Sequence, residues 1–355
     1  GIDELDRLAQ VVERVVAGES GIMQVSAVPA RVFDPLPQHR VVLTRGPYAY
    51  LKIAEGCNHG CAFCAIPGIR GRYRSRPVTS VVREAESLLA AGFRELNLIS
   101  QDTFSYGRDL GGDTNLAGLL RGLDGIGGSF WIRMLYGYPT GLTDELLDTI
   151  SQLPHVCRYL DIPVQHRDPR ILGAMRRGGT LKVLPDLVSR ARRVLPDVAL
   201  RTTCLVGFPG ETETEFEHLA AFVREMGFDH LGVFVFSPEE GTPAFDMPGA
   251  VPPSVAEDRR GRLLEAQRDV VDRRQAGFVG TQADLLVERI EGTRRRTAYG
   301  RSRRLAPEVD GEVRVRNIDR DVKPGSFMSV RYTAAEGYDM EAVAVGLTKN
   351  TGEQG

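Results

Sequence analysis

The sequence predicts an α/β protein, built as an incomplete, TIM-like (β/α)6 barrel followed by a small OB-like β-barrel. Between residues 48 and 236, short apolar runs alternate with amphipathic segments, which is typical of parallel strands joined by helical crossovers. A closed eight-unit barrel takes about 250 residues. This stretch covers only about 190 residues, so six units fit its length better than eight. Beyond residue 275, short alternating runs separated by turn signals indicate the second barrel.

Residues 1–42 are expected to be a linker with little core of its own. An amphipathic helix is predicted at Asp3–Val16, where apolar residues recur at helical spacing. A stretch punctuated by Pro29, Pro35 and Pro37 follows it and predicts an irregular connection. The first residue is Gly1, and we expect the native amino terminus to lie further upstream.

Residues 43–274 are expected to form the barrel core, with six strands and five intervening helices. The strands are predicted at Tyr48–Ala54, Glu95–Ser100, Trp131–Tyr136, Tyr159–Val164, Ala199–Gly207 and His230–Phe236. The helices are predicted at Ser80–Ala91, Asn115–Leu123, Thr143–Leu153, Leu181–Leu195 and Thr212–Met226. A long charged helix, from Ser254 to about Arg274, completes this unit.

Residues 275–347 are expected to form the small β-barrel, and residues 348–355 a tail. Five strands are predicted at Ala283–Ile290, Ala298–Arg304, Glu312–Ile318, Phe327–Tyr332 and Glu341–Leu347. Asp-Gly and Lys-Pro-Gly segments between them are turn signals.

Composition limits the class of protein. The 355 residues are 42% hydrophobic and 26% charged, as in ordinary soluble globular proteins. A net charge of −2 excludes a general nucleic-acid-binding surface, so any such contact must come from a local patch. No apolar run approaches the ~20 residues that a membrane helix needs, so no membrane association is expected.

Three cysteines carry the strongest chemical signal. Cys57, Cys61 and Cys64 form a Cys-x3-Cys-x2-Cys run. A structural zinc site takes four protein ligands, and a four-iron cluster normally takes four thiolates. Three cysteines therefore predict a cluster with one iron free for a non-protein ligand. A zinc knuckle, with His59 or a distant residue as fourth ligand, is the alternative, although no second Cys-x2-Cys pair follows.

The remaining cysteines, Cys157 and Cys204, stand beside apolar runs and are expected to be buried rather than ligands or disulfide partners. An odd cysteine count and an oxygen-sensitive cluster favour a reducing, cytoplasmic location.

The cysteine spacing resembles the signature of the radical S-adenosylmethionine (SAM) enzymes. In that family, SAM chelates the open iron of a [4Fe-4S] cluster, and the reduced cluster splits SAM into methionine and a 5'-deoxyadenosyl radical. Four segments also appear in the order found in methylthiotransferases: Ala-Glu-Gly-Cys-Asn-His at 54–59, Ser-Gln-Asp-Thr-Phe-Ser-Tyr-Gly at 100–107, Asp-Ile-Pro-Val-Gln-His at 161–166 and Val-Gly-Phe-Pro-Gly-Glu-Thr at 206–212. With the terminal β-barrel, called a TRAM domain in that family, the resemblance covers roughly residues 43–345.

Within that family the chain most resembles the RimO type, which inserts a methylthio group on the β-carbon of an aspartate in the twelfth protein of the small ribosomal subunit. The related MiaB type, which modifies isopentenyl-adenosine in tRNA, typically has Gly-Gln-Asn-Val where this chain has Ser-Gln-Asp-Thr. Three hypotheses follow: a ribosomal-protein methylthiotransferase, a tRNA methylthiotransferase and, from another class, a zinc-stapled RNA-binding module.

The resemblance implies cofactors and partners. We expect a [4Fe-4S] cluster on Cys57, Cys61 and Cys64, together with SAM. We also expect a ribosomal protein substrate, possibly on the small ribosomal subunit, and an electron donor such as flavodoxin or ferredoxin. Full-length members carry an upstream domain whose three cysteines hold a second cluster. No cysteine precedes Cys57, so we expect this chain to be a fragment and the second [4Fe-4S] cluster only in the full-length protein.

Polar residues at the ends of predicted strands are candidate SAM contacts, because barrel enzymes place their sites at the carboxyl ends of strands. A turn or helix-capping segment is the alternative for residues 100–102, and a tight turn is the alternative for residues 207–211. Gln165 and His166 could reach the ribose or the substrate, but His166 is equally consistent with a packed polar residue. Phe63 is expected to shield the cluster from solvent. The candidate SAM contacts are Ser100, Gln101, Asp102, Gln165, Gly207 and Glu211.

Two groups of arginines stand out. Arg70, Arg72, Arg74 and Arg76 alternate after the cysteines, as expected of a solvated basic edge. The alternative is that they lie at the mouth of the site and hold an acidic substrate loop or ribosomal RNA. The second group is interpreted as a docking surface on the terminal barrel for protein or ribosomal RNA, and removal of residues 277–355 is expected to weaken substrate binding while sparing SAM cleavage. This group contains Arg294, Arg295, Arg296, Arg301, Arg303 and Arg304.

Overall fold

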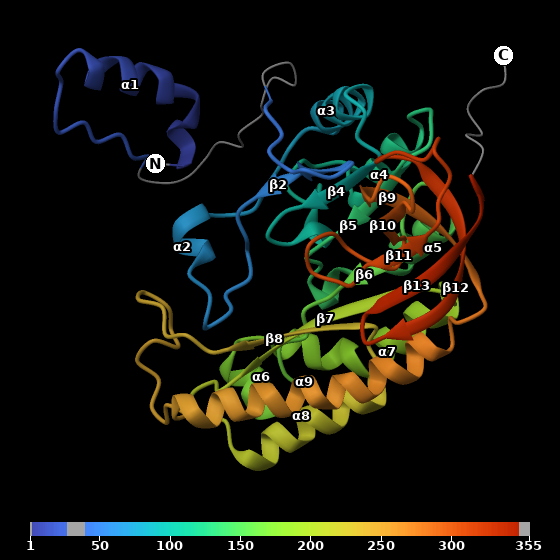
Figure 1. Cartoon of the computed structure of the whole chain (residues 1–355). Coiled ribbons are helices and arrows are strands. Elements are labelled where there is room, and N and C mark those ends of the chain that lie inside the picture. Colours follow the sequence, from blue (N-terminus) through green and yellow to red (C-terminus); the bar gives the residue numbers. More distant parts are fainter. Residues whose placement is uncertain (1, 27–39, 348–355) are drawn as a thin grey trace.

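The computed structural model describes residues 2–26 and 40–347 (Figure 1). The three prolines of the predicted linker and the expected tail lie outside these residues. The amino-terminal helix is only partly as predicted, because its first turns are a 3₁₀-helix at Ile2–Arg7 and the α-helix, α1, is Leu8–Val16. It stands apart from the barrel in Figure 1, and none of its residues is buried, so it adds nothing to the core.

Six parallel strands form the partial barrel, each within a predicted range. They form two three-stranded sheets in the orders β1-β4-β5 and β6-β7-β8. The two sheets are joined by a bridge between Ile132 and Val156 and by a hydrogen bond of 2.8 Å from Gly137 N to Asp161 O. The strands are β1 (Tyr48–Lys52), β4 (Glu95–Ile99), β5 (Trp131–Met134), β6 (Tyr159–Asp161), β7 (Ala199–Val206) and β8 (His230–Val235).

Helices cover the convex face of these strands. Alternate strand residues such as Leu96, Leu98 and Ile132 pack with the helices in the main apolar core. The crossover helices are α3 (Val78–Ala90), α4 (Leu116–Asp124), α5 (Asp144–Gln152), α7 (Gly178–Val194) and α8 (Glu213–Met226), and α9 (Pro253–Ala276) is the predicted charged helix. Thr212 caps α8 in a reciprocal capping box with Glu215.

Several short elements were not predicted. They are α2 (Ile66–Arg70), α6 (Pro169–Ala174), the paired two-residue strands β2 (Ala54–Glu55) and β3 (Arg74–Ser75), and 3₁₀ turns at Thr103–Ser105 and Pro139–Gly141. Each lies in a connection at the carboxyl end of a barrel strand, where periodicity gives no signal because the elements are only two to six residues long.

The terminal unit is a closed five-stranded barrel, which confirms the predicted second fold. Its strands follow the order β10-β11-β13-β12-β9 and close between β9 and β10. β11 and β13 pair in parallel, and the other neighbours are antiparallel. The strands are β9 (Gln282–Glu291), β10 (Thr297–Ser302), β11 (Val313–Arg316), β12 (Phe327–Glu336) and β13 (Asp339–Leu347).

The terminal barrel packs against the concave face of the partial barrel. Leu286, Ala306 and Phe327 share an apolar cluster with inward-facing strand residues that include Trp131 and Tyr159. Trp131 stacks obliquely on Phe327 with ring centroids 5.1 Å apart. The two units therefore bury a common core.

A buried ion-pair triad crosses the same interface. Glu95 at the start of β4 accepts from Arg133 Nε at 2.6 Å and from Arg301 Nη2 at 2.5 Å, and all three side chains are at most 3% exposed. Burial opposes ionisation of Glu95, but the two guanidinium groups outweigh it and lower the pKa of the carboxyl group.

The docking-surface interpretation is therefore wrong for three of the six arginines. Arg301 is buried in the triad, Arg303 donates to Pro154 O at 2.8 Å and lies over the Trp131 ring, and Arg304 pairs with Asp229. These side chains hold the two units together, and charge density along the sequence did not reveal that they point inward.

Among the described residues, no helix combines the length and apolar character needed to cross a membrane.

Candidate iron–sulfur and SAM site

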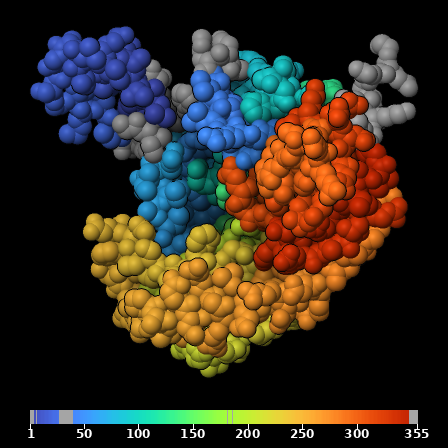
Figure 2. All heavy atoms as spheres, viewed as in Figure 1, coloured from blue at the N-terminus to red at the C-terminus, as the bar shows by residue number. Residues whose placement is uncertain are grey.

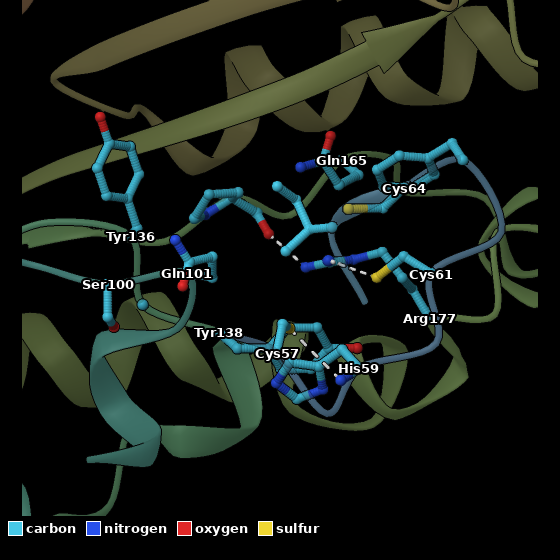
Figure 3. A pocket seen from close by; sticks show the side chains of 14 residues that line it. Cys57, His59, Cys61, Cys64, Ser100, Gln101, Tyr136, Tyr138, Gln165 and Arg177 are labelled. Atoms are coloured by element: carbon cyan, nitrogen blue, oxygen red, sulfur yellow. Dashed lines mark hydrogen bonds between the residues drawn. The ribbon is translucent and has the colours of Figure 1, made fainter. Parts of the chain in front are cut away.

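The three cysteines line one cavity of about 290 Å³ at the carboxyl ends of the barrel strands (Figure 3). Residues from the ends of β4, β5 and β6 complete its wall, as barrel chemistry predicts. The lining residues are Cys57, His59, Cys61, Phe63, Cys64, Ile66, Ser100, Gln101, Tyr136, Gly137, Tyr138, Pro163, Gln165 and Arg177.

The cysteine loop is held at its base by the short β2–β3 pair. Cys57 N donates to Gly71 O at 3.1 Å, which closes the loop above that pair. Gly56 has φ +83° and a Cβ there would lie 2.2 Å from Arg72 O, so only glycine fits. Its N–H donates to Gln101 Oε1 at 2.7 Å. Gln101 therefore both lines the cavity and positions the loop.

Burial makes the Cys57 and Cys64 thiols poor anions on their own. It raises the pKa of Cys57 to about 11, and it also raises the pKa of Cys64. Such thiols lose their protons when they bind metal. Within residues 2–26 and 40–347, no three His, Cys, Asp or Glu side chains are grouped around a point that one metal ion would occupy.

The donor set fits a sulfur-ligated iron cluster. Three thiols face a shared cavity, and the apolar side chains of Phe63 and Ile66 line it beside them. Arg177 is 5% exposed and its Nη1 donates to Cys61 Sγ at 3.4 Å. Hydrogen bonds to ligating sulfur and exclusion of solvent both adjust the potential of such clusters. Cys157 and Cys204 are fully buried elsewhere, and neither lines the cavity.

A stack of three side chains joins the cysteine loop to the opposite wall. His59 lies on the Tyr138 ring with centroids 3.6 Å apart, and the Arg177 guanidinium lies 4.3 Å from the centroid of the same ring. His59 Nε2 also contacts Asp102 Oδ2 at 2.7 Å. His59 thus packs and hydrogen-bonds against residues that follow β4 and β5.

Asp102 organises the wall. Its carboxylate accepts from His59, Ser105 and Tyr138 N, and the side chain is buried. Burial disfavours its charged form, but these hydrogen bonds outweigh burial and lower its pKa. Asp102 is not among the residues that line the cavity.

The other predicted contacts separate into two groups. Ser100, Gln101 and Gln165 line the cavity together with the cysteines. Gly207 and Glu211 belong to a buried corner at the end of β7 and do not line it.

In that corner, Glu211 accepts from Gly207 N, and its carboxylate lies 3.2 Å from His166 Nε2 and 3.1 Å from Arg259 Nη1. Because His166 Nδ1 accepts from Asp168 N, the ring proton is on Nε2 and is donated to Glu211. A Cβ on Gly207 would lie 2.6 Å from Ala256 Cβ. Gly207 and Glu211 therefore both have structural roles in this corner.

Sequence reasoning missed Tyr136, Tyr138, Pro163 and Arg177. The first two follow β5, and Arg177 lies between α6 and α7, twelve residues after Gln165. Tyr136 and Gln165 have φ of 63° and 69°, a left-handed conformation that costs energy for such residues. No sequence pattern marks these positions, because the backbone conformation that aims them arises from packing.

The first arginine group is mainly structural. Arg70 pairs with Glu55 at 2.8 Å, and Arg74 donates to the carbonyl groups of residues 70 and 72. Arg76 is 1% exposed and pairs with Glu84. Arg72 is exposed, so the predicted basic edge is reduced to one of its four members.

Comparisons with known proteins agree with this geometry. Residues 51–223 match the Radical SAM superfamily, and residues 279–345 match the TRAM domain family. A radical S-adenosylmethionine methyltransferase, TsrM from Kitasatospora setae, covers 68% of this chain and 52% of its own at a TM-score of 0.53 and 19% identity, which shows the shared fold.

Two curated relatives are much closer in sequence, and both are named ribosomal protein uS12 methylthiotransferase RimO. The one from Synechococcus sp. (strain RCC307) is 50% identical over 98% of this chain and 71% of its own length. The one from Syntrophus aciditrophicus (strain SB) is 44% identical over 97% of this chain and 76% of its own length. The chain therefore belongs to the radical SAM methylthiotransferases of the RimO family.

Proposed function

We propose that this chain carries the radical SAM core and TRAM domain of an enzyme that inserts a methylthio group on the β-carbon of an aspartate in ribosomal protein uS12. The observation that carries the proposal is one cavity in which three thiols meet polar side chains from three strand ends. Relatives 44–50% identical over nearly the whole chain favour uS12 over the tRNA substrate and over a zinc-stapled module.

Cys57, Cys61 and Cys64 would hold the [4Fe-4S] cluster, and SAM would occupy the adjoining cavity. When bound, the cluster and SAM supply the radical that removes hydrogen from the substrate carbon.

The chain's own side chains bind, orient and exclude water. The guanidinium group of Arg177 and the polar groups of Ser100, Gln101 and Gln165 face the cavity and suit the charged and hydroxylated parts of SAM. Phe63, Ile66 and Tyr138 exclude water from the same space. The roles first expected for Asp102, Gly207 and Glu211 in SAM binding remain predictions, and the contacts described above support positioning by these residues.

The remaining partners follow from the chemistry. A one-electron donor such as flavodoxin or ferredoxin would reduce the cluster, and a second [4Fe-4S] cluster would belong to the full-length protein. Because uS12 is a ribosomal protein and the cluster is oxygen-sensitive, we place the reaction in the reducing cytoplasm.

The proposal is tested by mass spectrometry of uS12 from cells with and without the gene. The methylthio-aspartate should disappear on deletion, return on complementation and stay absent with the Cys61→Ala gene. Iron and sulfide analysis of anaerobically reconstituted protein supplies the biochemical arm. A deletion strain with unchanged uS12, or purified protein that binds one zinc ion and no sulfide, would refute the proposal.

A further inference from the structure

A loop of the terminal barrel reaches into the open side of the partial barrel. The chain between β10 and β11, residues 303–312, lies against the concave face that leads from the cavity. Figure 2 shows the molecule hollowed between the cysteine loop in blue, the segment after β8 in yellow and the terminal barrel in orange and red. We call residues 303–312 the insertion loop.

The inner part of the insertion loop is anchored to the strands. Asp310 accepts from Tyr159 Oη at 2.7 Å and from Arg201 Nη1 at 2.8 Å, and its side chain is fully buried. His230 Nε2 contacts Arg304 O at 2.9 Å. These bonds hold the loop in a fixed position on β6, β7 and β8.

The tip of the loop presents a carboxylate to the hollow. Glu308 is exposed, and its two oxygens accept from Tyr48 Oη at 2.7 Å and Tyr50 Oη at 3.2 Å. It has φ of 68°, the left-handed conformation also found at Tyr136 and Gln165 on the cavity wall. Strained backbone of this kind concentrates at ligand sites. The Glu308 carboxylate also lies near enough to Tyr136 to contribute to the raised pKa of its hydroxyl group, after the larger effects of burial and of Asp161.

Buried polar atoms on the same face lack partners. Asn97 pairs with Tyr50 in the β1–β4 register, is fully buried, and has no hydrogen bond to either side-chain atom. Asp161, at the end of β6, is 3% exposed, and its Oδ1 has no hydrogen bond but lies 3.7 Å from Arg201 Nε as an ion pair. Buried polar groups normally find partners, so the orphaned Asn97 side chain beside Tyr50 indicates a polar occupant on this side of the sheet.

The charge of the hollow selects a cation. Arg201 is already matched by Asp310 and lies 3.7 Å from Asp161, while Arg301 is matched by Glu288 in addition to the Glu95 that it shares with Arg133. Across the described ranges, Glu308 forms no ion pair and is held only by its two tyrosines. Negative charge therefore exceeds positive charge at the tip of the insertion loop.

We infer that the insertion loop is a substrate-positioning element, in which Glu308 receives a lysine or arginine side chain of the protein substrate close to the modified residue. The inference rests on the proposed uS12 activity and adds how the terminal barrel contributes to it. A cation seated there is reached by the exposed Glu308 carboxylate, which the Tyr48 and Tyr50 hydroxyl groups hold in place. The terminal barrel thus recognises its substrate through an acidic loop rather than through its arginines.

The test measures binding of recombinant uS12 to the reconstituted chain at several salt concentrations. Glu308→Gln should weaken binding about tenfold, as expected for one charge-assisted hydrogen bond, and should flatten the salt dependence. Glu308→Lys should weaken it further. Glu291→Gln, an exposed carboxylate of the same barrel already paired with Arg289, is the matched control and should bind as the wild type does. Iron content and thermal unfolding report folding and loading of each variant.

Replacing each lysine and arginine that flanks the modified aspartate of uS12 by glutamine identifies the partner. One such variant should show the same loss as Glu308→Gln and little additional loss when the two are combined. If wild-type chain binds uS12 and Glu308→Gln binds it equally well, the inference is overturned while the proposed function stands. If wild-type chain does not bind uS12, the proposed substrate and this inference fall together.

Discussion

Replacing Arg301 should destabilise the protein far more than replacing an exposed arginine of the same barrel. Arg301→Met removes one of the two cations that hold the fully buried carboxylate of Glu95. Breaking a buried ion pair costs about 3–5 kcal/mol because a charge is left uncompensated. Glu95 keeps its bond to Arg133 at 2.6 Å, so we expect the lower end of that range, about 3 kcal/mol. Arg289→Met removes an exposed pair with Glu312 and should cost less than about 1 kcal/mol.

The single tryptophan provides the assay. Trp131 packs on Phe327 across the interface, so its fluorescence reports whether the two units remain docked during urea unfolding. The change should appear as a lower urea midpoint at a similar slope. A free-energy loss under about 1 kcal/mol for Arg301→Met would refute the view that the triad holds the units together.

The triad also predicts a pH dependence. The pKa of Glu95 is lowered in the folded protein, so its stabilising contribution is present above the unfolded pKa of about 4.3 and is lost as pH falls through the lower folded value. Arg301→Met should therefore reduce the loss of stability that acid causes, and an unchanged acid limb would contradict this reasoning.

Three further predictions concern the site and the hollow. Bound iron and SAM cleavage should each be abolished by Cys57→Ala, by Cys61→Ala and by Cys64→Ala. Cys204→Ala should keep both, because Cys204 is fully buried outside the cavity. Loss of iron in Cys204→Ala alone would reassign the ligands. Gly56→Ala should lower iron incorporation because its Cβ would meet Arg72 O at 2.2 Å, while Gly60→Ala, where no heavy atom lies within 4 Å, should not; equal iron content would show that the loop adapts. Burial raises the pKa of Asp161 to about 6, so its ionisation destabilises the fold as pH rises from about 4 to 6. Urea unfolding should therefore show that Asp161→Asn is more stable than wild type at pH 7 but not at pH 4.

The sequence was sufficient for the strands of both barrels because their signals are local. Alternating apolar residues and turn glycines mark each strand, and the structure confirms all eleven predicted ranges as strand positions. The run of three cysteines was equally visible, since Cys57, Cys61 and Cys64 lie within eight residues and need no tertiary information.

The rest of the site depends on packing between distant segments. Arg177 reaches Cys61 only because α6 and α7 bring it to the cysteine loop. Tyr138 stacks on His59 because β5 ends beside β4, whose other neighbour, β1, leads into that loop. The arginines of β10 were misread for the same reason, because charge density does not show which side of a strand meets another unit. Glu308 carried no sequence signal at all, because its position depends on contacts between a loop of the terminal barrel and the strands of the core.

Because of the insertion loop and the buried ion-pair triad, the terminal barrel is not an independent module that can be exchanged freely. A chimera that joins this core to another family member's barrel near residue 275 would need matching partners for Glu95, Arg201 and Tyr159, which lie in three separate strands of the core. Truncation at residue 277 would leave Glu95 without one of its two cations and uncover the Trp131 face, so the expectation that SAM cleavage survives removal of the barrel is unsafe. In evolutionary terms the two folds are constrained to change together, and compensating substitutions should be sought across this boundary rather than within either unit.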